Sequence, residues 1–538
     1  MNRLLPVFLL VIFFSAVAVL ADEGMHHEDL TSAQVGRVNF PISCAPAMQK
    51  PFERGVALLH SFWYEEAEKE FKQIGRDDPE CAVAHWGVAM SLWHQLWNHP
   101  EDAVVKEGMA EVKAGQALKP KTDRERDYLA AIGTFYSEAA KSDYQTSATA
   151  YANAMEKLHE RFPDDHEAAI FYGLSLLASE PDNDTAFDNR KKAAAVLEPL
   201  FAEQPDHPGV AHYLIHSYDK PQLAELGLPA ARRYAQIAPA APHALHMPSH
   251  IFARLGLWQD DINSNLASIA ATRKTAAMHM GGEGHQFHAM DFLVYAYLQC
   301  GREADGMKVI EEVRGMPAMK DTMYGSDFDP RSFALSVFPA NYAMELHHWS
   351  EAAALALVPG AHPSDQAFTY YARAIGAARS GKVEPARRDL AQLDGLHKTA
   401  VDQKKTERAE YIEDLRKVAQ AWVDHADGNN EEAVAALRGA AEKEESLGEE
   451  PGGLPAREML ADLLLELKRP EKALTEYEAD LKFNPNRFDG LYGAAQASEM
   501  AKKQEKADQY YAQVVKVCAG SSSDRPELAK AKALVARK

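Results

Sequence analysis

Apolar residues recur at helical spacing along almost the whole chain, and no run alternates between apolar and polar positions as a strand would. Several segments share one pattern, in which a small residue and a turn precede a charged stretch that leads into alanine. The pattern is found at residues 61–71, 255–265, 347–357, 427–437 and 467–481. It predicts an all-α chain of paired helices, in which the small residues let the two helices of a hairpin approach closely.

The helix pairs follow a regular period. Ala473 and Ala507 occupy equivalent positions in successive pairs, and several prolines fall where one pair ends and the next begins. Proline breaks a helix because it lacks the backbone N–H and its ring clashes with the preceding turn. The spacing of the two alanines matches the period of about 34 residues of the tetratricopeptide repeat, a helix–turn–helix unit. Residues 48–518 resemble that family, and the resemblance implies a right-handed solenoid of roughly ten to twelve stacked units.

Four long loops interrupt the repeats, at residues 179–189, 278–287, 315–331 and 447–455. The last of these is the predicted boundary between two repeat regions. We therefore expect a main solenoid over residues 22–446 and a C-terminal repeat module over residues 456–538.

Five sequence blocks point to a narrower group. They are FPISCAP, HSFWYEEAEKEF, DPECAVAHWGVAMS, HYLIHSYDKP and HMPSHIFARLGLW. In this order they resemble exported bacterial tetratricopeptide proteins of unassigned activity. That resemblance implies a fold and a compartment but no chemistry.

Residues 1–21 are typical of a secretory signal peptide. Arg3 provides a positive start, residues 4–17 are mostly apolar, and Val19-Leu20-Ala21 forms a small-residue cleavage site. The apolar run is short for a membrane span, and no later apolar run is as long as the helix that crosses a bilayer. We expect a periplasmic or secreted protein without a membrane span.

The formal net charge is −21, and loss of a signal peptide with one arginine and no acidic residue leaves −22. Such a surface repels nucleic acid and anionic lipid. We therefore expect no nucleic-acid partner.

Four cysteines are present. Export permits disulfides, and a bond between Cys44 and Cys81 would fasten the N-terminal segment to the first repeats. Cys300 and Cys518 stand in apolar helical contexts, which predicts buried free thiols.

Candidate chemistry is concentrated in two histidine pairs. His212 and His216 form one H-x-x-x-H pair, and His246 and His250 form another that follows one repeat period later in the chain. Equivalent positions of successive repeats lie side by side, and residues four apart share one helix face. We therefore expect the four imidazoles to form one patch.

The repeat frame adds further residues to this patch. Glu167 and Asp291 occupy the position of His212 and His246 in the preceding and following units, and Tyr295 occupies the position of His216 and His250. His288 lies about one helical turn before Asp291. Pro248 falls inside the second pair and disfavours helix at Met247, which weakens this alignment.

Two interpretations of the patch remain open. Neutral imidazoles and carboxylates suit Zn²⁺, and the nearby methionines Met247, Met278 and Met280 make copper a second candidate. Alternatively, the histidines form a buried network with the carboxylates Glu167, Asp219 and Asp291 and bind no metal. The full zinc motif H-E-x-x-H is absent.

A second group combines aromatic residues with histidines. It consists of His60, Trp63, Tyr64, Trp86, Trp93, His94 and Trp97. We interpret it as the core of the first repeats, with an aromatic ligand platform as the alternative.

Two functions follow from these features. The first is an exported scaffold that binds a peptide or protein segment on its concave face, or a small ligand at the histidine patch. The second is a zinc- or copper-dependent enzyme, most plausibly a hydrolase, centred on the same histidines.

Overall fold

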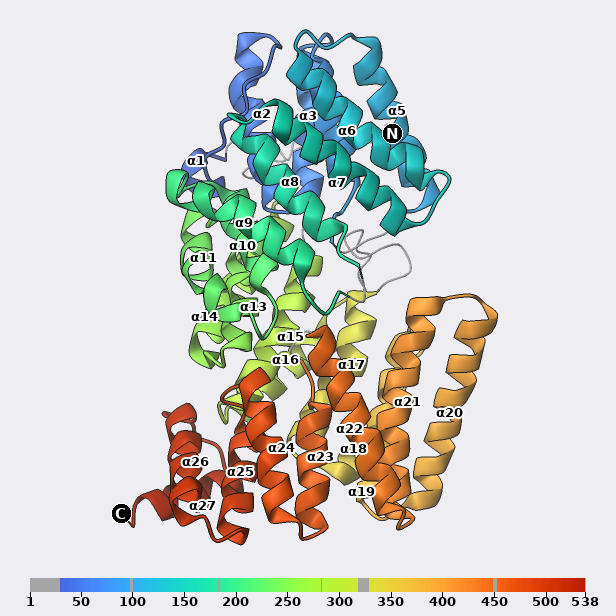
Figure 1. Cartoon of the computed structure of the whole chain (residues 1–538), viewed down its shortest axis with the longest axis vertical. Coiled ribbons are helices and arrows are strands. Elements are labelled where there is room, and N and C mark those ends of the chain that lie inside the picture. Colours follow the sequence, from blue (N-terminus) through green and yellow to red (C-terminus); the bar gives the residue numbers. More distant parts are fainter. Residues whose placement is uncertain are drawn as a thin grey trace, which may run out of the picture.

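The computed structural model describes residues 30–96, 100–181, 184–281, 283–317, 329–448 and 452–537. Within these ranges the chain is helical, with no strand. The predicted signal peptide and Trp97 lie outside the described residues. The helices pair as antiparallel hairpins that stack on one another, so the predicted all-α solenoid of tetratricopeptide type is confirmed (Figure 1).

The N-terminal repeats form the upper part of the molecule in Figure 1. A short helix α1 (Ser32–Val35) and a 3-10 turn (Pro46–Met48) precede the first hairpin. The helices that follow are α2 (Gln49–His60), α3 (Tyr64–Asp77), α4 (Ala82–Leu92), α5 (Asp102–Ala117), α6 (Asp123–Ala139), α7 (Tyr144–Arg161), α8 (His166–Ala178) and α9 (Asp188–Glu203).

The middle repeats carry the histidine pairs. Their helices are α10 (Pro208–Tyr218), α11 (Ala224–Ile237), α12 (Pro242–His246), α13 (Pro248–Arg254), α14 (Trp258–Ala277), α15 (Gly284–Gln299), α16 (Glu303–Gly315) and α17 (Pro330–Glu345). As expected from Pro248, one first helix is divided into α12 and α13. Met247 between them nevertheless keeps helical dihedral angles, with φ −51° and ψ −34°.

The remaining helices complete the lower part of the molecule. They are α18 (Trp349–Ala352), α19 (Pro363–Arg379), α20 (Val383–Asp402), α21 (Thr406–Ala426), α22 (Asn430–Leu447), α23 (Ala456–Glu466), α24 (Pro470–Phe483), α25 (Phe488–Met500), α26 (Gln504–Val517) and α27 (Pro526–Val535). One hydrophobic core contains Leu437 of α22 and Leu460 of α23, on opposite sides of the loop predicted to divide two repeat regions.

Small residues allow close helix packing, as the sequence pattern indicated. A Cβ atom at Gly87 would lie 2.3 Å from the ring of Phe71, and one at Gly55 would lie 2.8 Å from the same ring. Such distances are shorter than any normal contact, so only glycine fits between α2, α3 and α4.

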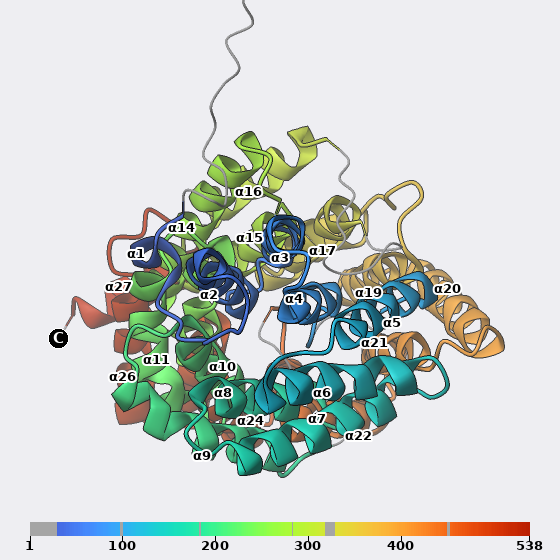
Figure 2. The ribbon, with the colours of Figure 1, turned by 90° about the horizontal axis from the view of Figure 1, so that it is seen from above.

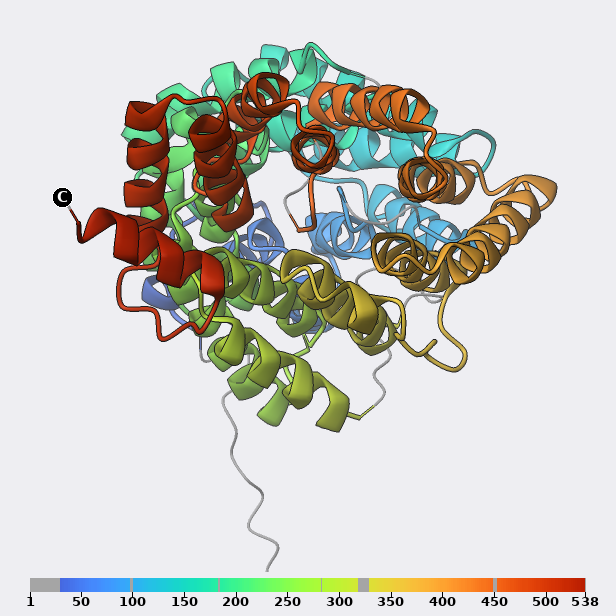
Figure 3. The same ribbon diagram turned by 90° about the horizontal axis from the view of Figure 1, so that it is seen from below.

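The superhelix turns back on itself. Seen from above and from below, the helices surround a common centre (Figures 2 and 3). The C-terminal repeats thereby reach the middle repeats: Trp258 Nε1 donates to the Asn486 carbonyl (2.8 Å), and Ser521 Oγ donates to the Gly301 carbonyl (2.5 Å). A Cβ at Gly256, whose φ is +61°, would lie 2.1 Å from the Pro485 carbonyl oxygen.

A buried arginine anchors this closure. Arg487 at the start of α25 has no exposed surface and forms ion pairs with Glu345 of α17 and Glu458 of α23, at 2.9 and 3.0 Å. Its guanidinium also donates to Tyr295 Oη of α15 at 2.8 Å. Because these partners come from three helices, the arginine joins the middle repeats to the C-terminal ones.

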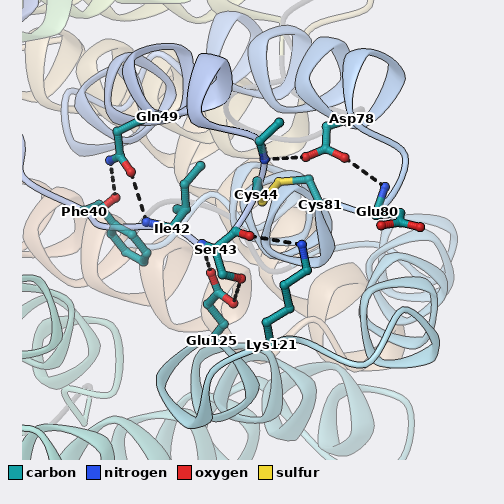
Figure 4. Close-up of a disulfide and its surroundings, with 11 residues drawn as sticks. Phe40, Ile42, Ser43, Cys44, Gln49, Asp78, Glu80, Cys81, Lys121 and Glu125 are labelled. Carbon is teal, nitrogen blue, oxygen red and sulfur yellow. Dashed lines mark hydrogen bonds between the residues drawn. A yellow bond between two sulfur atoms is a disulfide. The ribbon is translucent and has the colours of Figure 1, made fainter.

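The N-terminal segment is held by a disulfide between Cys44 and Cys81 (Figure 4). The predicted pairing is thus confirmed. Around it, Ala45 N donates to Asp78 Oδ2 (2.7 Å) and Ser43 N donates to Glu125 Oε1 (2.6 Å), so the segment is fixed on both sides of the bond. Cys300 and Cys518 are buried free thiols, as expected. No described helix is long and apolar enough to cross a membrane.

Candidate metal centre

The middle repeats bring six histidines together as two groups of three. Site A consists of His212 and His216 of α10 and His243 of α12, and site B consists of His246 of α12, His250 of α13 and His288 of α15. In each group the three ligand nitrogen atoms lie within 4.8 Å of one another. All four histidines of the predicted pairs, and His288, therefore lie in one neighbourhood.

Site A is centred on His212. Its Nε2 atom lies 3.0 Å from His243 Nε2 and 3.1 Å from His216 Nε2. Its Nδ1 atom lies 2.6 Å from the His60 carbonyl oxygen, which can only accept a hydrogen bond. The neutral His212 ring must therefore carry its proton on Nδ1, and the unprotonated Nε2 faces the other two rings.

In site B, two of the three rings have the same arrangement as His212, with Nδ1 donating a hydrogen bond outward. His250 Nδ1 lies 2.9 Å from Asp219 Oδ2, so this nitrogen donates to a carboxylate. His246 Nδ1 lies 2.7 Å from Asn265 Oδ1. The Asn265 amide is oriented by its own Nδ2, which donates to Asp261 Oδ1 at 2.6 Å, so His246 Nδ1 is also a donor.

The remaining nitrogens of these two rings face each other. His246 Nε2 and His250 Nε2 lie 3.0 Å apart. In neutral rings with both protons on Nδ1, both Nε2 atoms present lone pairs, which repel at this distance. A cation between them removes the repulsion. A hydrogen-bonded Nδ1 with an unprotonated Nε2 is also the arrangement that orients histidine as a metal ligand.

The two sites are immediate neighbours. The ring centroids of His243 and His246 are 6.2 Å apart, and those of His216 and His250 are 6.4 Å apart. Within site A, the centroids of His216 and His243 are separated by 6.3 Å. The distance between rings of different sites is thus similar to the largest distance within one site.

Burial keeps these imidazoles neutral. It lowers the pKa of His212, His243 and His246 well below the usual value, and the neighbouring imidazoles lower it further. The pKa of His216 is lowered to about 3 by the same causes. Neutral imidazole is the form that binds metal, so these ligands need not lose a proton at neutral pH.

Asp219 is an ionised group in direct contact with site B. Burial by itself would raise its pKa, but Arg254 and His250 outweigh that effect and hold the pKa well below its usual value. Arg254 Nε donates to Asp219 Oδ1 at 2.9 Å. The carboxylate is therefore charged and directs the Nδ1 proton of His250 away from site B.

One phenylalanine covers each site. Phe62, in the turn between α2 and α3, contacts all three rings of site A, with centroid distances of 4.3 Å to His212 and 5.5 Å to His243. Phe292 of α15 contacts all three rings of site B, at 5.1 Å from His246 and 4.7 Å from His250. Both phenylalanines are buried, whereas His216 and His288 are half-buried and form the side of the cluster toward solvent.

Glu167 lies with His60 and His207, in a third group whose ligand atoms lie within 4.8 Å of one another, and so belongs to a buried histidine–carboxylate network. Its carboxylate accepts hydrogen bonds from His60 Nε2 and His207 Nε2, both at 2.9 Å. Neither of these histidines belongs to site A or site B. His60 Nδ1 accepts from the Tyr213 hydroxyl, and His207 Nδ1 accepts from the Val210 amide. Every nitrogen of these two rings thus has a matching partner, and the group is a complete buried hydrogen-bond network.

The other two predicted residues are Asp291 and Tyr295. Asp291 is half-buried on α15, one turn beyond His288, and belongs to neither site. Tyr295 contacts Trp258 and Arg487 instead, because α15 turns its later residues toward the C-terminal repeats. The frame placed it correctly on a first helix but not on the histidine side.

Sequence reasoning missed His243 and His285. His243 lies three residues before His246, a helical spacing that a search for H-x-x-x-H pairs passes over. His285 packs 4.9 Å from His243 between ring centroids, and burial lowers its pKa to about 3. The aromatic group of the first repeats is core, as interpreted: Trp63, Trp86 and Trp93 are buried.

Comparisons with known proteins give little guidance on function. No family model matches the chain, and no curated protein matches it. Among solved structures, the human IFIT1 dimer with m7Gppp-AAAA is 12% identical, with a TM-score of 0.34, and the match covers 81% of this chain and 90% of that one. Yeast Tom70 is 11% identical, with a TM-score of 0.33, and the match covers 90% of this chain and 95% of that one.

These scores are too low to carry an argument about activity or partners. The stacked hairpins of this chain themselves have the tetratricopeptide architecture: the first helices α10 and α12 start one repeat period apart, at Pro208 and Pro242. The chain is a helical repeat protein of tetratricopeptide type, and its middle repeats enclose a cluster of six histidines.

Proposed function

We propose that this chain is a metal-binding repeat protein in which sites A and B each bind one transition-metal ion through three imidazoles. The observation that carries the proposal is the 3.0 Å separation of the unprotonated Nε2 atoms of His246 and His250. A proton shared between the two Nε2 atoms would also remove the repulsion between their lone pairs. Measuring how many metal ions the chain binds distinguishes a shared proton from a bound metal.

The surrounding hydrogen bonds support metal binding. The usual geometry around metal-bound histidine places a carboxylate, an amide oxygen or a backbone carbonyl on the second ring nitrogen. Here Asp219, Asn265 and the His60 carbonyl supply one partner of each kind, to His250, His246 and His212. Imidazole ligands suit copper, zinc and nickel, and the absence of carboxylate oxygen ligands from the two defined sites disfavours magnesium and calcium.

The repeat scaffold supplies a second part of the proposal. A cavity of about 220 Å³ lies beside Arg254 and is lined by aromatic residues, including Tyr295, Phe368 and Tyr371. Arg254 also donates to Asp219, which accepts from His250, so Arg254 and Asp219 connect the cavity to site B. A peptide or small ligand bound there would be linked to a metal ion in site B through Arg254, Asp219 and His250. Export, expected from residues 1–21, belongs to the same proposal.

A metal-dependent hydrolase is the second candidate. Each site provides three protein ligands. One ligand of each site is half-buried: His216 in site A and His288 in site B. Three ligands with a fourth position open to solvent are typical of catalytic zinc, which activates water.

Metal analysis of protein prepared without a histidine tag tests the proposal. After metal removal and equilibration with one divalent ion at a time, we expect two tightly bound ions per chain. The double variant H246A/H250A should bind one. H207Q, which changes a buried histidine of the complete network, should still bind two. Protein that binds no ion above background would contradict the proposal and leave the shared proton as the explanation.

A further inference from the structure

We infer that sites A and B form a single binuclear copper centre that binds dioxygen between its two ions. This rests on the proposed function, because it requires both sites to hold metal. The first argument is adjacency: the centroid separations across the sites, 6.2 and 6.4 Å, are similar to the 6.3 Å found within site A. Rings this close can place two ions within reach of one small bridging ligand.

The ligand set favours copper. Both sites consist only of imidazoles, and for a given set of nitrogen ligands divalent copper binds more tightly than the other first-row ions. No carboxylate belongs to either site, so none of the positive charge of the ions is neutralised by a ligand. Uncharged ligands favour the lower oxidation state, which makes two copper(I) ions a stable resting form.

Two copper(I) ions together can supply the two electrons that reduce dioxygen to peroxide. Each ion loses one electron and becomes copper(II), and dioxygen gains both and becomes a bridging peroxide. No proton or leaving group is needed, and the reverse transfer releases dioxygen. Copper is one of the cofactors through which proteins carry out dioxygen chemistry.

The walls of the site fit a small uncharged ligand. Phe62 covers site A and Phe292 covers site B, with exposed fractions of 1% and 3%. These rings exclude water from one side of the six imidazoles, while the half-buried His216 and His288 leave the other side closer to solvent. A largely buried, aromatic-walled site of this kind suits a small uncharged ligand such as dioxygen better than a large or charged one.

The test uses full-length protein loaded anaerobically with two equivalents of copper(I) and then exposed to dioxygen. We expect uptake of one dioxygen per two coppers. The electron paramagnetic resonance signal should correspond to far less than two spins, because bridged copper(II) ions couple magnetically. Two full spins per chain would show independent ions and overturn the inference, while the copper content would still support the proposed function.

Variants separate the remaining outcomes. H288A should lose the ion of site B, show one full spin per bound copper after oxidation and lose stoichiometric dioxygen uptake. H85Q, which changes a half-buried histidine on α4 that pairs with Glu111, should behave as the unchanged protein. Retention of two zinc ions that copper cannot displace would overturn the copper centre alone. Failure to bind any metal would overturn the proposed function itself.

Discussion

His246 and His250 point their Nε2 atoms at each other across 3.0 Å, and each ring donates its other proton outward, to Asn265 and to Asp219. The two outward hydrogen bonds determine which nitrogens face inward. Without them, either ring could adopt the other tautomer and donate to its neighbour. The proposed binding of a cation at site B therefore depends on Asn265 and Asp219, which are not ligands themselves.

Replacing Asp219 by asparagine tests this dependence. The amide keeps the size of the side chain but removes the negative charge that fixes the tautomer of His250. We expect metal affinity at one of the two sites to fall about 10- to 100-fold, as is usual for partners of metal-bound histidine. Titration calorimetry should resolve one weakened and one unchanged site. D206N, at an exposed ion pair with Arg233, serves as control and should leave both affinities unchanged.

The buried histidines should make stability depend on pH. Burial lowers the pKa of His285 to about 3 in the folded state, whereas the unfolded chain titrates near 6.5. Between these values the unfolded state binds the proton and the folded state does not, so folding is favoured less as pH falls. The contribution amounts to about 1.4 kcal/mol per pH unit for each such histidine.

Buried carboxyl groups act in the opposite direction; burial raises the pKa of Asp365 to about 7, for example. The contribution of His285 is therefore measured as the difference in unfolding free energy between H285L and the unchanged protein. Metal-free H285L should gain about 1 kcal/mol of stability relative to the unchanged protein between pH 6.5 and 5.5, because at pH 6.5 only half of the unfolded histidine is protonated. Urea unfolding at several pH values measures this, and a difference that does not vary with pH would show that His285 is protonated in the folded state.

The disulfide should contribute substantially to stability. Cys44 and Cys81 are 37 residues apart, and closing a loop of this length stabilises the folded state by about 3–4 kcal/mol in the chain-entropy model. The double variant C44S/C81S should unfold at correspondingly lower urea concentration. Reducing agent should destabilise the original protein and leave the variant unaffected. If reduction lowers the stability of both equally, the effect comes from elsewhere.

Arg487 should be among the most sensitive positions. Its replacement by methionine leaves Glu345 and Glu458 buried without their shared cation, which costs about 3–5 kcal/mol. We expect a large loss in urea unfolding. Adding E345Q and E458Q to R487M removes the uncompensated charges and should restore part of the loss. A triple variant no more stable than R487M would mean that packing, and not charge, dominates at this position.

Local sequence patterns determined the fold class. Helical periodicity, the repeat period and the small residues at hairpin crossings depend on contacts within one repeat or between neighbours. Gly87 is an example: it packs against Phe71 with no room for a Cβ atom, so a glycine at this position indicates a close helix crossing. The same locality explains why His212, His216, His246 and His250 could be expected to meet: they lie on adjacent first helices at equivalent positions.

The tertiary structure decided the rest of the site. His243 completes site A because α12 turns a particular face toward α10, and a repeat frame does not specify that rotation; His288, which the frame did place near the patch, completes site B. The same frame assigned Glu167 and Tyr295 to the patch, whereas packing directs Glu167 to His60 and His207 and directs Tyr295 to Arg487. The contacts with His60 and Arg487 join segments that lie far apart in the sequence. They arise because the superhelix turns back on itself, and no local pattern encodes that closure.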